Sequence, residues 1–226
     1  MNFLAFLREN APFLLAGAVL SFTSSYGQTY FISIFAGEIR ETFGLSNGAW
    51  GGIYTLGTAV SAGIMLWSGA LPDRFRTREI APVVLGCLAL ACLAMAVNTS
   101  VILLPVVILA LRLFGQGMSS HLALVSMARW FKATRGRALA VATFGFALGE
   151  AVMPLGFAAL KRVMDWRTLW IGAAVVCLLA IPVLLALLRE ERTPQSVAES
   201  EASFGMGGRM WTRGEVLVHP LFLSLI

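Results

Sequence analysis

Charged residues are scarce in this sequence. Asp, Glu, Lys and Arg together make up 13% of the 226 residues, whereas a soluble globular domain carries about 25%. The few charges are clustered, and long apolar stretches without any charge separate the clusters. This pattern excludes a soluble globular domain, so the segments of the chain are defined here by their hydropathy.

Histidine and cysteine are also too few for metal chemistry. The sequence has two histidines, from which no zinc site can be assembled. Its three cysteines, Cys87, Cys92 and Cys177, lie inside apolar stretches, as small packing residues do, so disulfides are not expected. We expect no metal and no other cofactor. An intramembrane enzyme would need a metal or nucleophile set at membrane depth, and the sequence offers none.

A continuous basic stripe with interleaved aromatics is missing as well. The net charge is +5 and the pI is about 9.6, but the basic residues stand in short loops between apolar segments. Nucleic acid is therefore not an expected partner. The first apolar stretch is longer than the core of a signal peptide and is followed by five more, which indicates an uncleaved first helix.

Six apolar stretches are long enough to cross a membrane. About 20 residues at 1.5 Å each span about 30 Å of hydrocarbon, and lipid leaves the backbone no partner outside a helix. The predicted spans are residues 12–36, 48–71, 80–98, 101–128, 138–160 and 168–188. The sequence therefore predicts an all-α membrane protein with the lipid bilayer as its surroundings.

The loop charges predict the orientation. Alternate loops hold ten basic residues on one side and four on the other. The first group is Arg8, Arg74, Arg76, Arg78, Arg129, Lys132, Arg135, Arg137, Arg189 and Arg192; the second is Arg40, Lys161, Arg162 and Arg167. The positive-inside rule places the first group, and with it the N-terminus, in the cytoplasm. We expect a bacterial inner membrane as the location.

The composition changes after residue 190. Residues 1–190 are the expected six-helix bundle, and residues 191–218 are rich in Glu, Ser and Gly, as expected of a cytoplasmic linker. Residues 219–226 begin a new apolar run that covers about 12 Å as helix, which is too short to cross. They are interpreted as the truncated start of a seventh helix.

The loop after the second span carries a recognisable motif. It contains Gly69, Leu71, Asp73, Arg74 and Arg78. This loop resembles the signature G-x-L-x-D-R-x-G-R-R of the major facilitator superfamily, which stands between the second and third spans. Two positions depart from the signature, because Arg76 replaces the second glycine and Thr77 the next basic residue.

Later segments carry the same resemblance. Arg112 is followed by Gly115 and Gly117, similar to the fourth-helix arginine and glycines of the family. Residues 128–138 resemble its RWF…RG-A stretch, and the fifth span is similarly rich in glycine and proline. Helices 1, 4 and 5 resemble monocarboxylate and oxalate/formate carriers loosely.

The resemblance implies a fold and a mechanism. The fold would be two inverted three-helix repeats, and the mechanism alternating access around a midplane site between two six-helix halves. Gly69, Asp73, Arg74 and Arg78 would form the conformational motif. The resemblance covers residues 1 to about 190, so the second, C-terminal six-helix half is an expected partner.

Two charged residues stand at membrane depth. Arg112 in the fourth span and Glu150 in the fifth differ in depth by about one helical turn. Because each charge costs roughly 3 kcal/mol or more at the bilayer centre, both are candidate functional residues. They could form an ion pair or both face one cavity. Burial favours the protonated carboxylate and a nearby arginine the ionised one, and this competition suits a proton-coupled carrier.

Bulky polar residues in the first span are further candidates. Bulky hydrogen-bonding side chains at this depth avoid lipid, so Tyr26, Gln28 and Tyr30 are predicted substrate contacts. Together the candidates favour a secondary transporter, coupled to protons, for a small solute such as an organic anion. The alternative is a self-contained six-helix channel or homodimeric pore.

Overall fold

A computed structural model describes residues 3–190 together with Glu215, His219 and Pro220. Residues 1–192 form one unit. Its described part consists of helices and connecting turns, with no strand among residues 3–190. The expected linker over residues 191–218 and the expected helix start over residues 219–226 lie almost wholly outside the described residues.

Four of the six predicted spans are continuous helices. They are α5 (Asn47–Ser68), α7 (Thr77–Val97), α10 (Arg135–Leu160) and α11 (Trp166–Leu187). Each begins and ends within a few residues of the predicted limits. Two of them have side-chain caps, because Ser46 accepts a hydrogen bond from the Ala49 N–H and Asp165 from the Arg167 N–H. The all-α membrane fold is confirmed.

The fourth span is a run of three helical segments. These are α8 (Leu104–Leu111), the π-helix η2 (Arg112–Ser119) and α9 (Ser120–Trp130). Single π-turns inside α-helices are rare and occur frequently at functional sites. A short helix, α6 (Leu71–Arg74), follows α5 at one end of the bundle.

The first span is broken, so the prediction of one continuous helix over residues 12–36 was wrong. It consists of α2 (Ala11–Thr23), the 3-10 helix η1 (Ser24–Gly27) and α3 (Thr29–Ile34), and α4 (Ala36–Phe43) follows. Gln28, with φ −80° and ψ 153°, is extended and interrupts the helix. All four residues of η1 are buried. Irregular backbone is tolerated at membrane depth where protein surrounds it.

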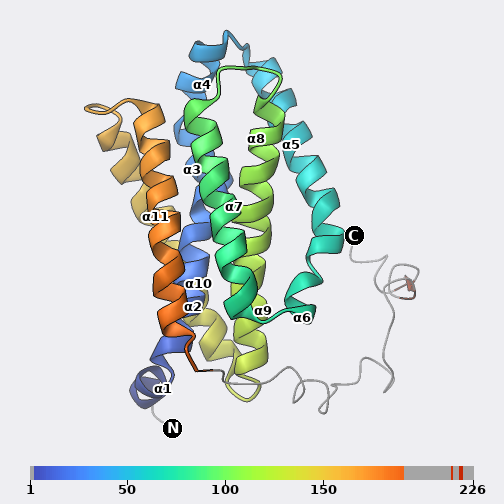
Figure 1. Ribbon diagram of the computed structural model, residues 1–226, viewed down its shortest axis with the longest axis vertical. Helices are drawn as coiled ribbons and strands as arrows, with labels where there is room; N and C mark the ends of the chain where they lie inside the picture. The colour runs from blue at the N-terminus through green and yellow to red at the C-terminus, as the bar shows by residue number, and fades with distance from the viewer. Residues whose placement is uncertain (1–2, 191–214, 216–218, 221–226) are drawn as a thin grey trace. The chain divides into compact units, whose positions relative to one another are not determined.

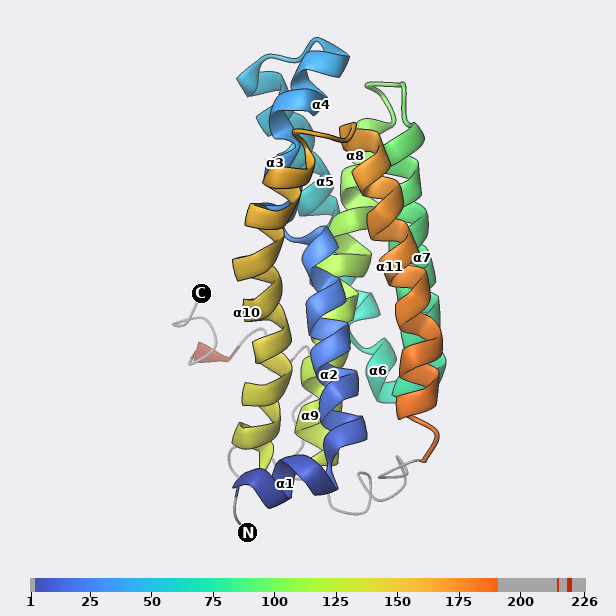
Figure 2. The same ribbon diagram turned by 90° about the vertical axis from the view of Figure 1, so that its left-hand side faces the viewer.

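Helix packing follows an inverted repeat (Figures 1 and 2). α2 packs on α10 and α5 on α8, while η1 meets η2 and α7 packs on α11. If spans 1, 2 and 3 are exchanged with spans 4, 5 and 6 respectively, the same pairs of spans are in contact. Because consecutive spans alternate in direction, the exchanged spans are antiparallel, as in inverted-topology repeats.

The loops gather at two ends of this unit. α1 (Phe3–Glu9), α6, the loop after α9 and the end of α11 lie at one end, and α4 lies at the other (Figures 1 and 2). The members of the larger basic group that the structure describes, all but Arg192, therefore share one end of the bundle. α1 bends by 84° from α2 and η1 and lies across that end (Figure 2).

Candidate functional site

The breaks in the first and fourth spans meet at two glycines. A Cβ atom on Gly27 would lie 2.1 Å from the Leu111 carbonyl oxygen and 2.7 Å from the Gly115 Cα. A Cβ on Gly115 would lie 2.5 Å from the Gly27 Cα. The two backbones are thus in direct contact, which only residues without a side chain permit. This crossing fixes the centre of the bundle.

Arg112 is held at this crossing. It is the first residue of the π-helix and is 7% exposed. Its Nη1 donates to the Gly27 carbonyl oxygen at 3.2 Å and to Thr29 Oγ1 at 3.0 Å. The break at Gln28 explains these contacts, because it leaves the Gly27 carbonyl available to a side chain. Tyr54 completes the arrangement from α5: its hydroxyl donates to Thr29 Oγ1 at 3.0 Å, and its ring centroid lies 5.6 Å from the Arg112 guanidinium carbon.

A pocket of about 420 Å³ lies between α5 and the η2–α9 run. Its lining residues are Thr58, Ser61, Ala62, Met65, Arg112, Gln116, Gly117, Ser120, His121 and Leu124. Arg112 is the only permanently charged residue among them, and no acidic residue is present.

Three buried polar atoms of the pocket residues lack a hydrogen-bond partner. They are Arg112 Nε, Gln116 Oε1 and Thr58 Oγ1. Buried polar groups in native proteins are almost always paired, because leaving one unpaired costs about 1–3 kcal/mol. The pocket residues therefore include two buried donors and one buried acceptor that no other described group satisfies.

Glu150 lies apart from this pocket. Its side chain is exposed on α10, and no ion pair joins it to Arg112 within residues 3–190. Of the two arrangements expected for this pair, the direct ion pair is absent. Tyr30 is close to the same stretch of α10, because its ring packs edge-on against Phe146 at 5.8 Å between centroids.

The other predicted contacts of the first span have different surroundings. Gln28 is 8% exposed at the break, beside the residues that hold Arg112. Tyr26 is 3% exposed and packs edge-on against Phe31 at 5.0 Å, within the aromatic core. Neither residue lines the pocket. Their roles as substrate contacts remain predictions.

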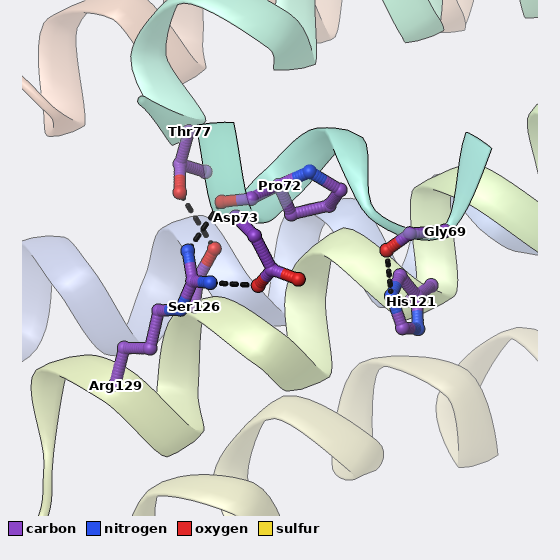
Figure 3. Close-up of polar contacts among 7 residues, drawn as sticks. All are labelled: Gly69, Pro72, Asp73, Thr77, His121, Ser126 and Arg129. Atoms are coloured by element: carbon purple, nitrogen blue, oxygen red, sulfur yellow. Dashed lines mark hydrogen bonds and ion pairs between the residues drawn. The ribbon is translucent and has the colours of Figure 1, made fainter. Parts of the chain in front are cut away.

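Three side chains of α9 hold the loop that carries the conformational motif (Figure 3). His121 Nε2 lies 2.9 Å from the Gly69 carbonyl oxygen, and Thr77 Oγ1 lies 2.7 Å from Ser126 Oγ. Arg129 forms an ion pair with Asp73 and also donates to the Pro72 carbonyl oxygen. The arginine that pairs with Asp73 thus comes from the fourth span and not from the loop that contains Asp73.

A comparison with protein families assigns the chain. The description of the matching family is Major Facilitator Superfamily, and the match covers residues 5–226. The chain belongs to this superfamily. It is therefore a multi-pass membrane protein of the transporter class. No curated protein and no solved structure matches it.

The remaining residues of the superfamily motif have simple structural roles. Gly69 is in the right-handed helical region, with φ −59° and ψ −18°. A Cβ there would lie 2.8 Å from the Met65 carbonyl oxygen of its own helix and 3.9 Å from His121 Nε2. The contact that crowds this glycine therefore comes from its own helix and not from a neighbouring one. Arg74 is exposed, and Arg78 donates to the Arg189 carbonyl oxygen at 3.3 Å.

Several residues of this candidate site were not singled out from the sequence. Tyr54, Thr58, Gln116 and Ser120 are ordinary polar residues of apolar spans, and nothing in their spacing distinguishes them. His121 both lines the pocket and contacts the Gly69 carbonyl oxygen. His121 therefore links the pocket to the conformational motif.

Proposed function

We propose that this chain binds a small organic anion at Arg112 and moves it across the membrane by alternating access. The observation that supports this most is the buried Arg112 side chain, with an unpaired Nε, at a pocket with no acidic residue among its described lining residues. An arginine stays protonated under all physiological conditions, so the pocket carries a fixed positive charge.

The geometry suits a carboxylate. One side of the guanidinium is already used by Gly27 and Thr29, which fixes the orientation of its planar fork. The Nε side is left for an incoming oxygen, and hydrogen bonds to charged groups contribute about 1.5–3 kcal/mol. Gln116 and Thr58 add neutral hydrogen-bonding groups near the same charge. A small carboxylate with a hydroxyl group would satisfy all three, because the carboxylate accepts from Arg112 Nε and Thr58 and the hydroxyl donates to Gln116 Oε1.

Proton coupling is assigned to Glu150 in this proposal. Its side chain is exposed on an otherwise apolar stretch of α10, where facing lipid as an anion would cost several kcal/mol. Protonation removes that cost, so the carboxyl group has a reason to exchange its proton as its surroundings change between the two access states. Uptake of an anion together with a proton would make the chain a symporter.

A second six-helix bundle is the proposed partner. Of an 18-residue apolar stretch within residues 47–74, which contain α5, only 11% is buried. The corresponding share is 28% in α10 and 56% in α7. The exposed side of α10 carries Glu150, which needs protein or water rather than lipid against it. A second bundle placed over α5 and α10 would cover their exposed apolar surfaces and give Glu150 protein to contact. We place the pair in a bacterial inner membrane with the N-terminus in the cytoplasm.

Binding by the purified chain tests the anion site directly. Lactate and oxalate should raise the unfolding temperature of the detergent-solubilised chain, and lactamide, the uncharged analogue of lactate, should not. Arg112→Ala should weaken anion binding by about tenfold or more, because it removes a charge-assisted contact. Arg162→Ala, which removes an exposed arginine outside the pocket, is the matched control. Equal binding by both variants, or equal stabilisation by lactamide, would contradict the proposal.

The channel alternative makes a different prediction. A self-contained six-helix channel or homodimeric pore would conduct without saturating at millimolar anion and would not exchange internal for external substrate. A carrier saturates, and unlabelled anion on the far side accelerates entry of the labelled anion. Vesicle flux measurements separate the two.

A further inference from the structure

A second basic pocket lies at the end of the bundle that collects the larger basic group. Its volume is about 590 Å³, and its lining residues are Arg76, Arg78, Glu79, Leu185 and Arg189. Three arginines and one glutamate leave it with an excess of positive charge. The residues come from the start of α7 and the end of α11, two helices that pack against each other (Figures 1 and 2).

Both helices continue from this pocket as exposed apolar surfaces. On α7, Val83, Leu90 and Val97 are 62%, 65% and 70% exposed. They follow Arg76 at intervals of seven residues, and seven residues are nearly two helical turns, so they share one side of the helix. The pocket residue Arg76 thus stands at the end of a stripe that extends about 21 Å from Val83 to Val97.

Exposed apolar residues at intervals of seven are also found on α11. Leu178 and Ile171 precede the pocket residue Leu185 at intervals of seven and are 46% and 44% exposed. No charged residue occurs in α7 after Glu79 or in α11 between Arg167 and Leu187. The arginine cluster therefore stands at the end of two apolar stripes on neighbouring helices. Each stripe is long enough to extend through one leaflet of the bilayer.

We propose that this pocket binds the phosphate headgroup of an anionic phospholipid, whose acyl chains lie along α7 and α11. Basic pockets between spans on the cytoplasmic side are suited to such headgroups. The arginine forks supply bidentate contacts to phosphate oxygens. The apolar stripes distinguish a lipid from a free phosphate ion, because they give a ligand with acyl chains a contact that inorganic phosphate lacks.

Lipid binding to the delipidated full chain, counted by native mass spectrometry, tests the proposal. Phosphatidylglycerol should bind about tenfold more tightly than phosphatidylcholine with the same acyl chains. The double variant Arg78→Gln/Arg189→Gln should lose this preference. The double variant Arg40→Gln/Arg162→Gln removes the same charge from the opposite end and should keep it.

One further variant and one competition experiment separate lipid binding from the alternative explanations. Arg189→Lys retains the charge and should keep most of the preference, which separates loss of charge from damage to the fold. Millimolar glycerol phosphate should not displace phosphatidylglycerol, because it lacks the acyl chains. The proposal is overturned if Arg78→Gln/Arg189→Gln keeps its preference for phosphatidylglycerol, or if glycerol phosphate competes as well as the lipid does.

Discussion

At the scale of single residues, Gly27 decides how closely the first and fourth spans approach. Gly27→Ala would place a methyl group 2.1 Å from the Leu111 carbonyl oxygen, and backbone atoms cannot move aside as a flexible side chain can. Overpacking of this kind typically costs about 1–3 kcal/mol. We expect a lower unfolding temperature in detergent and weaker anion binding, since Arg112 depends on the Gly27 carbonyl.

Gly86→Ala is the matched control for Gly27→Ala. Apart from the adjoining backbone of α7 itself, no atom lies within 4 Å of the position that a Cβ would take at Gly86. Alanine in a helix interior is favoured over glycine by about 0.5–1 kcal/mol, so this variant should be unchanged or slightly more stable. An unfolding temperature for Gly27→Ala equal to that of Gly86→Ala would contradict the close crossing.

Glu150 gives a second prediction at this scale. Glu150→Gln keeps the shape of the side chain and its polarity but cannot exchange a proton. We expect vesicles with this variant to lose anion uptake driven by a pH gradient and to retain exchange of internal for external anion, which needs no net proton movement. Glu41→Gln, on an exposed residue of α4, should alter neither flux. Gradient-driven uptake at the normal rate would exclude Glu150 as the proton carrier.

At the scale of helices, hydropathy predicted the spans because length and apolarity are properties of each segment alone. The break at Gln28 could not be predicted in this way, since it accompanies the contact of Gly27 with the fourth span. The partner of Asp73 was missed for the same reason: Arg129 is 56 residues away. Arg112 was found because a charge at membrane depth is conspicuous by itself. The neutral residues that surround it became visible only when α5 and η2 were placed side by side.

The attachment of the motif to α9 leads to a prediction for these two elements. Asp73→Asn should release the turn at α6 from α9 while leaving the bundle intact. The side chains of Arg129 and Asp73 are 32% and 63% exposed, and exposed ion pairs contribute only about 0–1 kcal/mol. We therefore expect an almost unchanged unfolding temperature but faster amide hydrogen exchange over residues 69–76.

A charge reversal tests whether the pair itself is responsible. Asp73→Arg should accelerate exchange as Asp73→Asn does, and adding Arg129→Asp should slow it again by restoring an opposite pair. Arg74→Gln, next to Asp73 but exposed, is the control and should leave exchange unchanged. Failure of the second substitution to slow exchange would assign the effect to Pro72 or the backbone instead.

At the scale of the whole bundle, the inverted repeat and the loop charges make one joint prediction. The two repeats run in opposite senses, so the packing pattern looks alike from either end and cannot by itself set the orientation. The charges can, because nine of the thirteen basic residues considered above that the structure describes belong to one end. Translocating that end would be opposed by the positive-inside bias of short loops. The end with α1 and α6 should therefore face the cytoplasm.

Labelling with a membrane-impermeant maleimide measures this orientation. Thr99→Cys and Ala133→Cys both substitute exposed residues, in loops at opposite ends of the bundle. Background labelling should be low, since Cys92 and Cys177 are buried and Cys87 lies within α7. In intact cells the thiol at position 99 should react, while that at position 133 should react only after permeabilisation. The reverse pattern would place the basic loops outside, and with them the lipid pocket of Arg76, Arg78 and Arg189 in the other leaflet.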